Sequence, residues 1–119
     1  MTTTDAVNWN DMEWENVRPG IRRKVFHGEG CTVAYNEVRP GHEPKPHSHD
    51  YEQIAYIASG TAIYTVGEKA FEMTPGSIVR VPPLAEHFIM ATGTEPCVNI
   101  DIFTPRRTDY RQSPIKQTR

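Results

Sequence analysis

The chain has 119 residues, a mass of 13.5 kDa and a formal net charge of −2, and these values limit what it can be. The length suffices for one compact domain and is too short for two. No long run of Lys and Arg occurs, so the concentrated positive charge of a nucleic-acid-binding surface is missing. The longest apolar run, residues 54–58, is far shorter than the roughly 18 residues of a membrane-spanning helix. We therefore expect neither nucleic acid nor a membrane as a partner.

The N-terminus and the cysteines indicate the compartment. Residues 1–5 contain neither the basic segment nor the apolar segment of a secretory signal. Cys31 and Cys97 are too few for the disulfide framework of a secreted domain. One bridge between them is conceivable, but we expect reduced thiols and a cytoplasmic protein.

Taken in chain order, the sequence predicts an N-terminal arm, a β domain and a C-terminal tail. The arm, residues 1–20, contains Trp9 and Trp14, which should pack on the domain or on a partner subunit. Residues 21–105 show short strand-like segments separated by Gly and Pro, and no sustained helical periodicity. They predict eight strands, at residues 21–26, 31–38, 53–59, 61–66, 69–73, 77–81, 87–91 and 97–103. Residues 106–119 are mildly basic and are expected to form a solvated tail. This spacing predicts an all-β sandwich or barrel.

Two histidine-bearing segments contain the specific chemistry. His47 and His49 are two residues apart, so on an extended chain both imidazoles point to one side, and Gln53 has the same parity. His87, in a later segment, would add a third imidazole from an opposite strand. Three imidazoles and an amide oxygen suit one divalent metal ion, Fe, Mn, Ni or Zn, and leave positions open for water or substrate. Glu52 has the wrong parity and is the alternative ligand if the chain is kinked before it.

The spacing in these segments resembles the paired motifs of the cupin superfamily. The first motif is matched at Gly41, His47, His49 and Gly60, with Gln53 where Glu is usual; the second is matched at Gly76, Pro82 and His87. The sequence departs from the second motif at Leu84, where Gly is usual, and at Ala91, where Asn is usual. The resemblance implies a single-domain cupin, which is a double-stranded β-helix or jelly-roll barrel, and it implies the four metal ligands named above.

The replacement of Glu by Gln at position 53 has an electrostatic consequence. A carboxylate would neutralise one unit of the metal's charge, whereas an amide leaves the full +2 in the site. A more cationic metal is a stronger Lewis acid and attracts anionic ligands more strongly. We therefore expect a small anionic substrate.

A closer resemblance is to the small cupins of uronate breakdown, the KdgF-type proteins. It rests on residues 20–26, residues 47–53 and residues 99–110. It implies conversion of a 4,5-unsaturated monouronate to the linear 5-keto-4-deoxyuronate, with a metal that polarises substrate oxygens while side chains move protons.

The last predicted strand supplies candidate catalytic residues. Alternation places Val98, Ile100 and Ile102 on one face and Asn99, Asp101 and Phe103 on the other. An Asp inside a strand is costly unless it is used, so Asp101 is the candidate general acid or base if its face is the lumen. The alternative is a structural Asp, bonded to a neighbouring strand or to Arg23.

Further residues are candidates for holding the substrate. Arg107, just past the last strand, could hold a substrate carboxylate with two hydrogen bonds. Arg23, Tyr35 and Phe103 are candidate substrate-binding residues that point to the lumen.

Three functions are compatible with these residues. The first is a metal-dependent enzyme that opens or tautomerises a small carboxylated sugar or keto acid without redox change. The second is an Fe(II)-dependent dioxygenase, and the third is a non-catalytic cupin that binds a small molecule. We also expect a homodimer, because the two Trp residues and an edge strand at residues 21–26 should leave apolar surface and unpaired backbone to cover.

Overall fold

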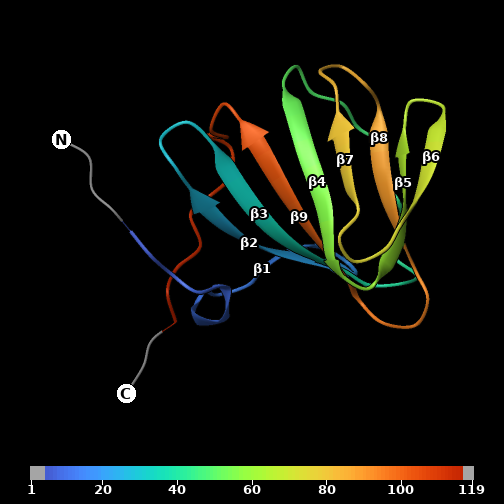
Figure 1. Ribbon diagram of the computed structural model, residues 1–119. Coiled ribbons are helices and arrows are strands. Elements are labelled where there is room, and N and C mark those ends of the chain that lie inside the picture. Colours follow the sequence, from blue (N-terminus) through green and yellow to red (C-terminus); the bar gives the residue numbers. More distant parts are fainter. Residues whose placement is uncertain (1–4, 117–119) are drawn as a thin grey trace.

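Two antiparallel sheets form the computed structural model of the chain, which describes residues 5–116 (Figure 1). The larger sheet has the strand order β1-β2-β3-β9-β4-β7, and the smaller has the order β6-β5-β8. The described elements are η1 (Trp9–Asp11), β1 (Glu15–Arg18), β2 (Ile21–His27), β3 (Thr32–Val38), β4 (Glu52–Ser59), β5 (Thr61–Val66), β6 (Lys69–Met73), β7 (Ile78–Val81), β8 (His87–Thr92) and β9 (Cys97–Thr104). Among residues 5–116, no helix is long and apolar enough to cross a membrane.

The predicted jelly-roll barrel is confirmed. Each of the eight predicted strands is present with bounds within one residue of those expected, and β1 is an additional strand. Non-consecutive strands are neighbours, because β9 lies between β3 and β4. This crossover brings the last predicted strand to the middle of the larger sheet, and with it the candidate acid Asp101.

The apolar core lies between the two sheets and occupies one part of the interior. Strand β4 shows the division, because Gln53, Ala55 and Ile57 all point inward and only the last two belong to the core. Strand β5 of the smaller sheet contributes Ala62 and Tyr64. The core therefore ends at Gln53, and the polar residues beyond it line a cavity.

The turn between β4 and β5 carries the chain from one sheet to the other and requires glycine. Gly60 has a φ of +75°, and a Cβ atom there would lie 2.5 Å from the Pro96 carbonyl oxygen and 2.7 Å from Cys97 Cα. Both neighbours are backbone atoms, which cannot move aside as the end of a side chain can. Only glycine fits where the chain passes so close to the start of β9.

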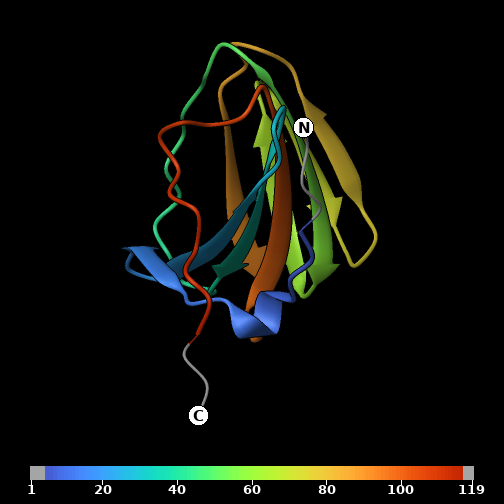
Figure 2. The same cartoon turned by 90° about the vertical axis from the view of Figure 1, so that its left-hand side faces the viewer.

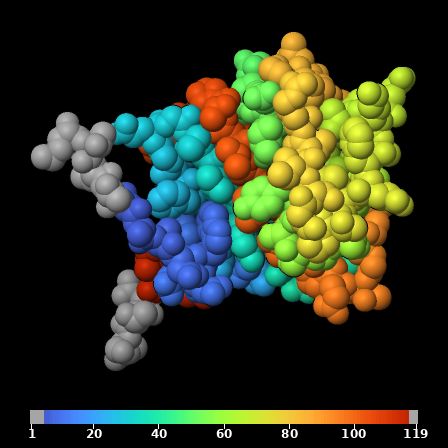
Figure 3. Space-filling view, in the orientation of Figure 1, coloured from blue at the N-terminus to red at the C-terminus, as the bar shows by residue number. Residues whose placement is uncertain are grey.

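The N-terminal arm packs on the larger sheet of its own chain. Trp9 and Trp14 lie against Tyr35 on β3, with ring centroids 5.2 and 5.8 Å apart. The Lys24 ammonium donates to the Trp9 carbonyl oxygen and lies over the Trp14 ring. Figure 3 shows the arm in blue, in contact with the part of the larger sheet coloured cyan. Of the two alternatives for the tryptophans, the structure shows packing on the domain.

The C-terminal tail is docked and is not a solvated extension over its described part. The Val25 amide on β2 donates to the Ser113 hydroxyl (2.7 Å), and the Ser113 amide donates back to the Val25 carbonyl (3.1 Å). Met12 pairs with Ile115, so the arm and the tail are joined. Figure 2 shows the tail (red) descending beside β2 toward the arm. Because β1 and the tail both bond to β2, the expectation that residues 21–26 form a free edge strand is wrong.

Candidate functional site

The histidines lie where the two sheets meet. His47 and His49 precede β4 in an irregular loop, and His87 begins β8. The backbones of His47 and His87 exchange two hydrogen bonds, of 3.1 and 2.9 Å, which connect the loop to the smaller sheet. The Leu84 amide donates to the His49 carbonyl oxygen (2.7 Å) and holds the second half of the loop. The expected extended segment from His47 to Gln53 is therefore a loop fixed from the opposite sheet, followed by a strand.

The three imidazoles face one another with their Nε2 atoms. One ring nitrogen from each of the three lies within 4.8 Å of the others. Each Nδ1 lies 2.9 Å from the carbonyl oxygen of a residue two positions away, Lys45 for His47, Tyr51 for His49 and Ala85 for His87. A carbonyl oxygen can only accept, so each Nδ1 carries a proton, and Nε2 is the ring nitrogen left to coordinate a metal ion. The backbone thus presets all three rings as ligands.

The side chain of Gln53 is oriented by two hydrogen bonds. Its Nε2 donates to the Tyr64 hydroxyl (3.1 Å) and to Asp101 Oδ1 (2.8 Å). The amide oxygen is left to face the histidines, 3.0 Å from His49 Nε2. The alternative ligand Glu52 points outward and lies 3.5 Å from the exposed Arg80. Gln53 is thus the oxygen donor that the site offers.

This donor set fits a divalent metal ion. His87 is 1% exposed, and its Nε2 has no hydrogen-bond partner among the described residues. Burial lowers the pKa of His87 to about 4 and lowers the pKa of His47 below its usual value. Both rings are therefore neutral at pH 7, as metal coordination requires. Three imidazoles and one amide oxygen form a set that Fe, Mn, Ni and Zn accept.

A cavity of about 400 Å³ opens beside the metal ligands. Its wall includes His47, His87 and Gln53 from the ligand set. The remaining polar and aromatic residues of the wall come mostly from β2, β3, β9 and the C-terminal tail; they include Arg23, Asn36, Tyr64, Asn99, Asp101, Phe103, Arg107 and Tyr110. The larger sheet thus supplies most of the groups that a ligand in this cavity would meet.

Asp101 lies in this cavity and accepts three amide hydrogen bonds. Its Oδ1 accepts from Gln53 and from Asn99 (2.9 Å), and its Oδ2 accepts from Asn36 (3.0 Å). Burial raises the pKa of Asp101 to about 6, although these hydrogen bonds and the charge of Arg107 favour the ionised form. A carboxyl group with a pKa in this range can both take and return a proton near pH 7. The prediction that Asp101 faces the lumen agrees with this placement.

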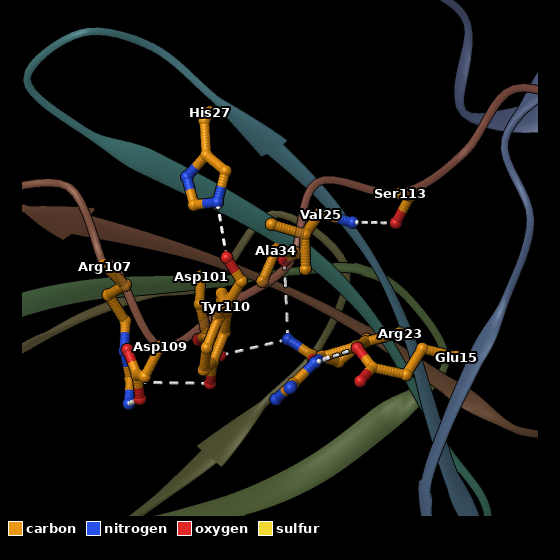
Figure 4. A network of polar contacts seen from close by, with 11 residues as sticks. Glu15, Arg23, Val25, His27, Ala34, Asp101, Arg107, Asp109, Tyr110 and Ser113 are labelled. Carbon is orange, nitrogen blue, oxygen red and sulfur yellow. Dashed lines mark hydrogen bonds and ion pairs between the residues drawn. The ribbon is translucent and has the colours of Figure 1, made fainter.

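Arg107 reaches the same cavity from the C-terminal tail. Its guanidinium lies over the rings of Phe103 and Tyr110, 4.7 and 4.0 Å from their centroids. It bonds Asp109 through two nitrogens, at 3.1 and 2.7 Å, and donates to the Tyr110 hydroxyl (Figure 4). Side-chain exposure is 16% for Arg107 and 63% for Asp109. A buried arginine thus holds an exposed carboxylate at the cavity wall.

Comparison with known proteins identifies the family. A sequence profile described as the cupin domain matches residues 34–103, more than half of the chain. The chain belongs to the cupin family. No curated protein gives a significant sequence match.

Solved structures agree with this assignment. KdgF from Halomonas sp. is 28% identical to this cupin, with a TM-score of 0.83, covering 90% of this chain and 98% of its own. An RmlC-like cupin from Shewanella frigidimarina is 22% identical, with a TM-score of 0.81, covering 90% and 96%. The resemblance to KdgF-type cupins drawn from the sequence is therefore supported over nearly the whole chain.

Two of the three candidate substrate-binding residues line the cavity, and the third does not. Arg23 and Phe103 line the cavity of the cupin. Figure 4 shows Tyr110 between Arg107 and Arg23, and the Arg23 guanidinium lies 3.8 Å from the Tyr110 ring centroid. Tyr35 lies on the opposite face of β3, under the tryptophans of the arm, so its prediction as a lumen residue is wrong. Arg23 pairs with Asn36, the next residue along β3, and neighbours on a strand point to opposite faces.

Three residues next to Asp101 and Arg107 were not among the candidates drawn from the sequence. Tyr64 and Asn36 both bond the groups around Asp101, and Tyr110 packs against Arg107. The alternation in β5 pointed Tyr64 inward together with Ala62, so this residue could have been found. Tyr110 follows the last strand, in a tail whose docking no local pattern indicated.

Proposed function

We propose that this cupin binds one divalent metal ion with His47, His49, Gln53 and His87 and isomerises a small unsaturated uronate to its open-chain keto form. The observation that carries the proposal is the position of Asp101. A carboxyl group with a raised pKa is hydrogen-bonded to a metal-ligand side chain and lines the same cavity as Arg23 and Arg107. Likeness to KdgF over 90% of the chain supports the substrate class.

The metal would supply Lewis acidity, polarising an oxygen atom of the bound substrate. The ligand set contributes no negative charge, so the whole charge of the ion acts on the substrate. The usual Glu ligand is Gln53 here, and the nearest carboxylate belongs to Asp101, which is hydrogen-bonded to the Gln53 amide nitrogen. A base is thus kept beside the metal without being consumed as a ligand.

The proposed reaction moves protons and neither gains nor loses electrons. The C1 hydroxyl group loses a proton and the ring oxygen gains one as the bond from C1 to the ring oxygen breaks, which yields an aldehyde and an enol. The enol becomes the C5 ketone when its hydroxyl group loses a proton and C4 receives one. Asp101 would act as the proton carrier, because it is the described acid group that lines the cavity.

Two arginines suit the substrate carboxylate. Arg107 has the buried, aromatic-stacked guanidinium that holds a carboxylate in a fixed orientation. Its two-nitrogen edge is bonded to Asp109, which is largely exposed, so a substrate carboxylate would take the place of that side chain. Arg23, on the other side of Tyr110, keeps Glu15 as a partner through Nε alone.

The test combines metal analysis with a substrate screen. The purified protein would be assayed for bound metal and offered 4,5-unsaturated monouronates and small keto acids, with and without oxygen. We expect loss of the C4–C5 double bond and appearance of the keto product by NMR, at equal rates in both atmospheres. Oxygen consumption that depends on Fe(II) would instead identify a dioxygenase. A metal-loaded protein that binds uronates and turns over none of them would identify a binding module.

A further inference from the structure

A second cleft lies next to the metal cavity. It has a volume of about 700 Å³ and is formed by the turn between β1 and β2 and by the segment that follows β3. The Arg39 amide donates to the Gly20 carbonyl oxygen (2.9 Å) and joins these two segments. Its lining residues are Arg18, Pro19, Gly20, Arg39, Pro40, Gly41, His42, Glu43, Pro44 and Lys45. Of these, Arg18 and Lys45 also line the metal cavity, so the two hollows share a border.

The charged residues of the cleft are mostly cations. Arg18, Arg39 and Lys45 face a single acid, Glu43. Arg18 donates to the carbonyl oxygen of Glu43, which anchors the guanidinium and leaves its charge uncompensated. Neither Arg18 nor Lys45 forms an ion pair with any residue in the range 5–116.

Arg39 has only a distant carboxylate partner. It lies 3.5 Å from Glu37, whose carboxylate is bonded more closely, and by two nitrogens, to Arg22. The Arg39 side chain is 59% exposed, so it is free to turn toward a ligand in the cleft.

His42 adds a buried hydrogen-bond donor to the same cleft. The side chain is 8% exposed, and its Nε2 accepts a hydrogen bond from the Ala91 amide on β8 (3.2 Å). Because burial lowers the pKa of His42, the ring is neutral, and the proton must lie on Nδ1. Nδ1 forms no hydrogen bond of good geometry among the described residues, although the Glu43 backbone lies close to the ring. A buried N–H needs an acceptor, which a ligand or a water molecule at the border of the cleft would supply.

We propose that this cleft binds an anionic group, a carboxylate or a phosphate. Arg18, Arg39, Lys45 and His42 line the same cleft, and all four side chains carry donors that an oxyanion accepts from. The anionic group could belong to the far end of the molecule held in the metal cavity, since Arg18 and Lys45 border both hollows. It could also belong to a separate small anion. The proposal rests on the cleft itself and holds whatever reaction the metal site performs.

The first test measures a free anion. Inorganic phosphate would be titrated into ¹⁵N-labelled, metal-loaded protein, with the amides of Gly20 and Gly41 and the ring nitrogens of His42 observed by NMR. We expect these signals to shift and the affinity to fall about fivefold in Arg39→Gln, which does not border the metal cavity. Arg80→Gln, which removes an equal charge from the exposed face of β7, is the matched control and should leave the affinity unchanged.

The second test measures a tethered anion. Acetate and dicarboxylates of increasing length would be titrated into the same metal-loaded proteins. If the cleft receives the far end of a ligand in the metal cavity, the longer dicarboxylates bind more tightly than acetate, and Arg39→Gln removes that advantage. The proposal is overturned if phosphate does not perturb His42 and chain length does not matter, or if Arg39→Gln and Arg80→Gln behave alike. No turnover is measured, so this failure would be distinct from a failure of the proposed reaction.

Discussion

At the level of single residues, the distribution of charge around Gln53 distinguishes this site. The ligand oxygen is neutral, and the nearest carboxylate, on Asp101, is bonded to the amide nitrogen of that same ligand. An ionised carboxylate can only accept hydrogen bonds, so Asp101 determines which end of the Gln53 amide faces the histidines. One side chain therefore orients a metal ligand and is also positioned to move a proton.

These two roles of Asp101 lead to the first prediction. We expect Asp101→Asn to keep the metal and to lower turnover by about 10²-fold or more, because an amide cannot carry the proton. The new amide oxygen can still accept from Gln53 and Asn99. Steady-state kinetics on the uronate substrate and metal content after dialysis would measure the two effects separately. Loss of the metal, or full activity, would contradict the assignment.

A double variant provides the control for structural damage. In Asp101→Asn the new NH₂ group faces the Asn36 amide nitrogen, which donates to Oδ2 in the parent protein. Asn36 cannot simply turn over, because the same nitrogen also bonds the Asn99 carbonyl oxygen (3.1 Å). Combining Asp101→Asn with Asn36→Ala removes the amide that the new NH₂ group would face. Part of the lost stability should return in the double variant, whereas activity should not.

Leu84 adopts a backbone conformation that suits glycine, the usual residue at this point of the second cupin motif. Its φ is +70°, and its side chain is 73% exposed. A left-handed conformation costs an ordinary residue about 1–2 kcal/mol, and the greater freedom of an unfolded glycine offsets roughly half of this. We expect Leu84→Gly to raise the free energy of unfolding by roughly 0.5–1 kcal/mol, measured with urea. Leu84→Ala keeps the Cβ atom and should bring no gain; equal effects of the two variants would show that strain is not the cause.

At the level of elements, the strands that follow from local sequence patterns were predicted correctly. Alternating side chains and turn residues located eight strands to within one residue. Strand β1 was missed because Glu15–Arg18 is short and charged; it forms a hairpin with the adjacent β2 and is further held by the ion pair between Glu15 and Arg23. The docking of the tail on β2 joins Val25 and Ser113, 88 positions apart. Contacts at such separation leave no periodic signal in either segment.

The candidate site was predictable to a similar extent. The motif spacing indicated the four ligands, because the number of residues between them fixes their positions in the loop before β4, on β4 and on β8. The lumen face of β3 was not predictable from parity alone, since alternation gives two faces and does not say which is inside. Tyr35 was therefore assigned to the wrong face, and the neighbouring Asn36 was overlooked.

The turn between β4 and β5 has no room for a side chain at Gly60. We expect Gly60→Ala to lower the free energy of unfolding by about 3 kcal/mol or more, because the added Cβ would clash with the backbone at Pro96 and Cys97. Gly76→Ala is the matched control, since Gly76 also has a positive φ, +96°, and its Cβ would meet no atom within 4 Å. That variant should lose about 1 kcal/mol. Equal losses in the two variants would mean that backbone conformation alone, without the clash, sets the cost.

For the whole molecule, the separation of core and metal site predicts the effect of metal removal. The residues that pack between the sheets include none of the four ligands. We expect His47→Ala combined with His49→Ala to abolish metal binding and to leave the barrel folded at room temperature. Circular dichroism and metal analysis of the purified variant would check both parts. An unfolded variant would show that the metal is structural and would weaken the proposed enzyme function.

The expected homodimer must be formed by a surface other than the tryptophans of the arm and strand β2. The tryptophans of the arm and strand β2 are covered within the chain, so they no longer require a partner. Strands β6 and β7 are instead the ends of their sheets among the described residues, and between them lies a cleft of about 580 Å³. Phe71 on β6 and Ile78 on β7 are 40% and 68% exposed there. We propose that a second copy of the chain covers this side, because its own edge strands can pair with the unpaired backbone of the first.

This proposal predicts a homodimer that one substitution weakens. Sedimentation velocity at micromolar concentration should give twice the chain mass of 13.5 kDa. Ile78→Lys places a charge in the apolar part of the contact and should weaken dimerisation by about 2 kcal/mol or more, roughly thirtyfold in Kd. Val17→Lys makes the same change on the opposite edge strand β1, where Val17 is 41% exposed, and should leave the mass unchanged. A dimer dissociated by Val17→Lys would place the contact on the larger sheet's other edge, and a monomeric parent protein would contradict the proposal altogether.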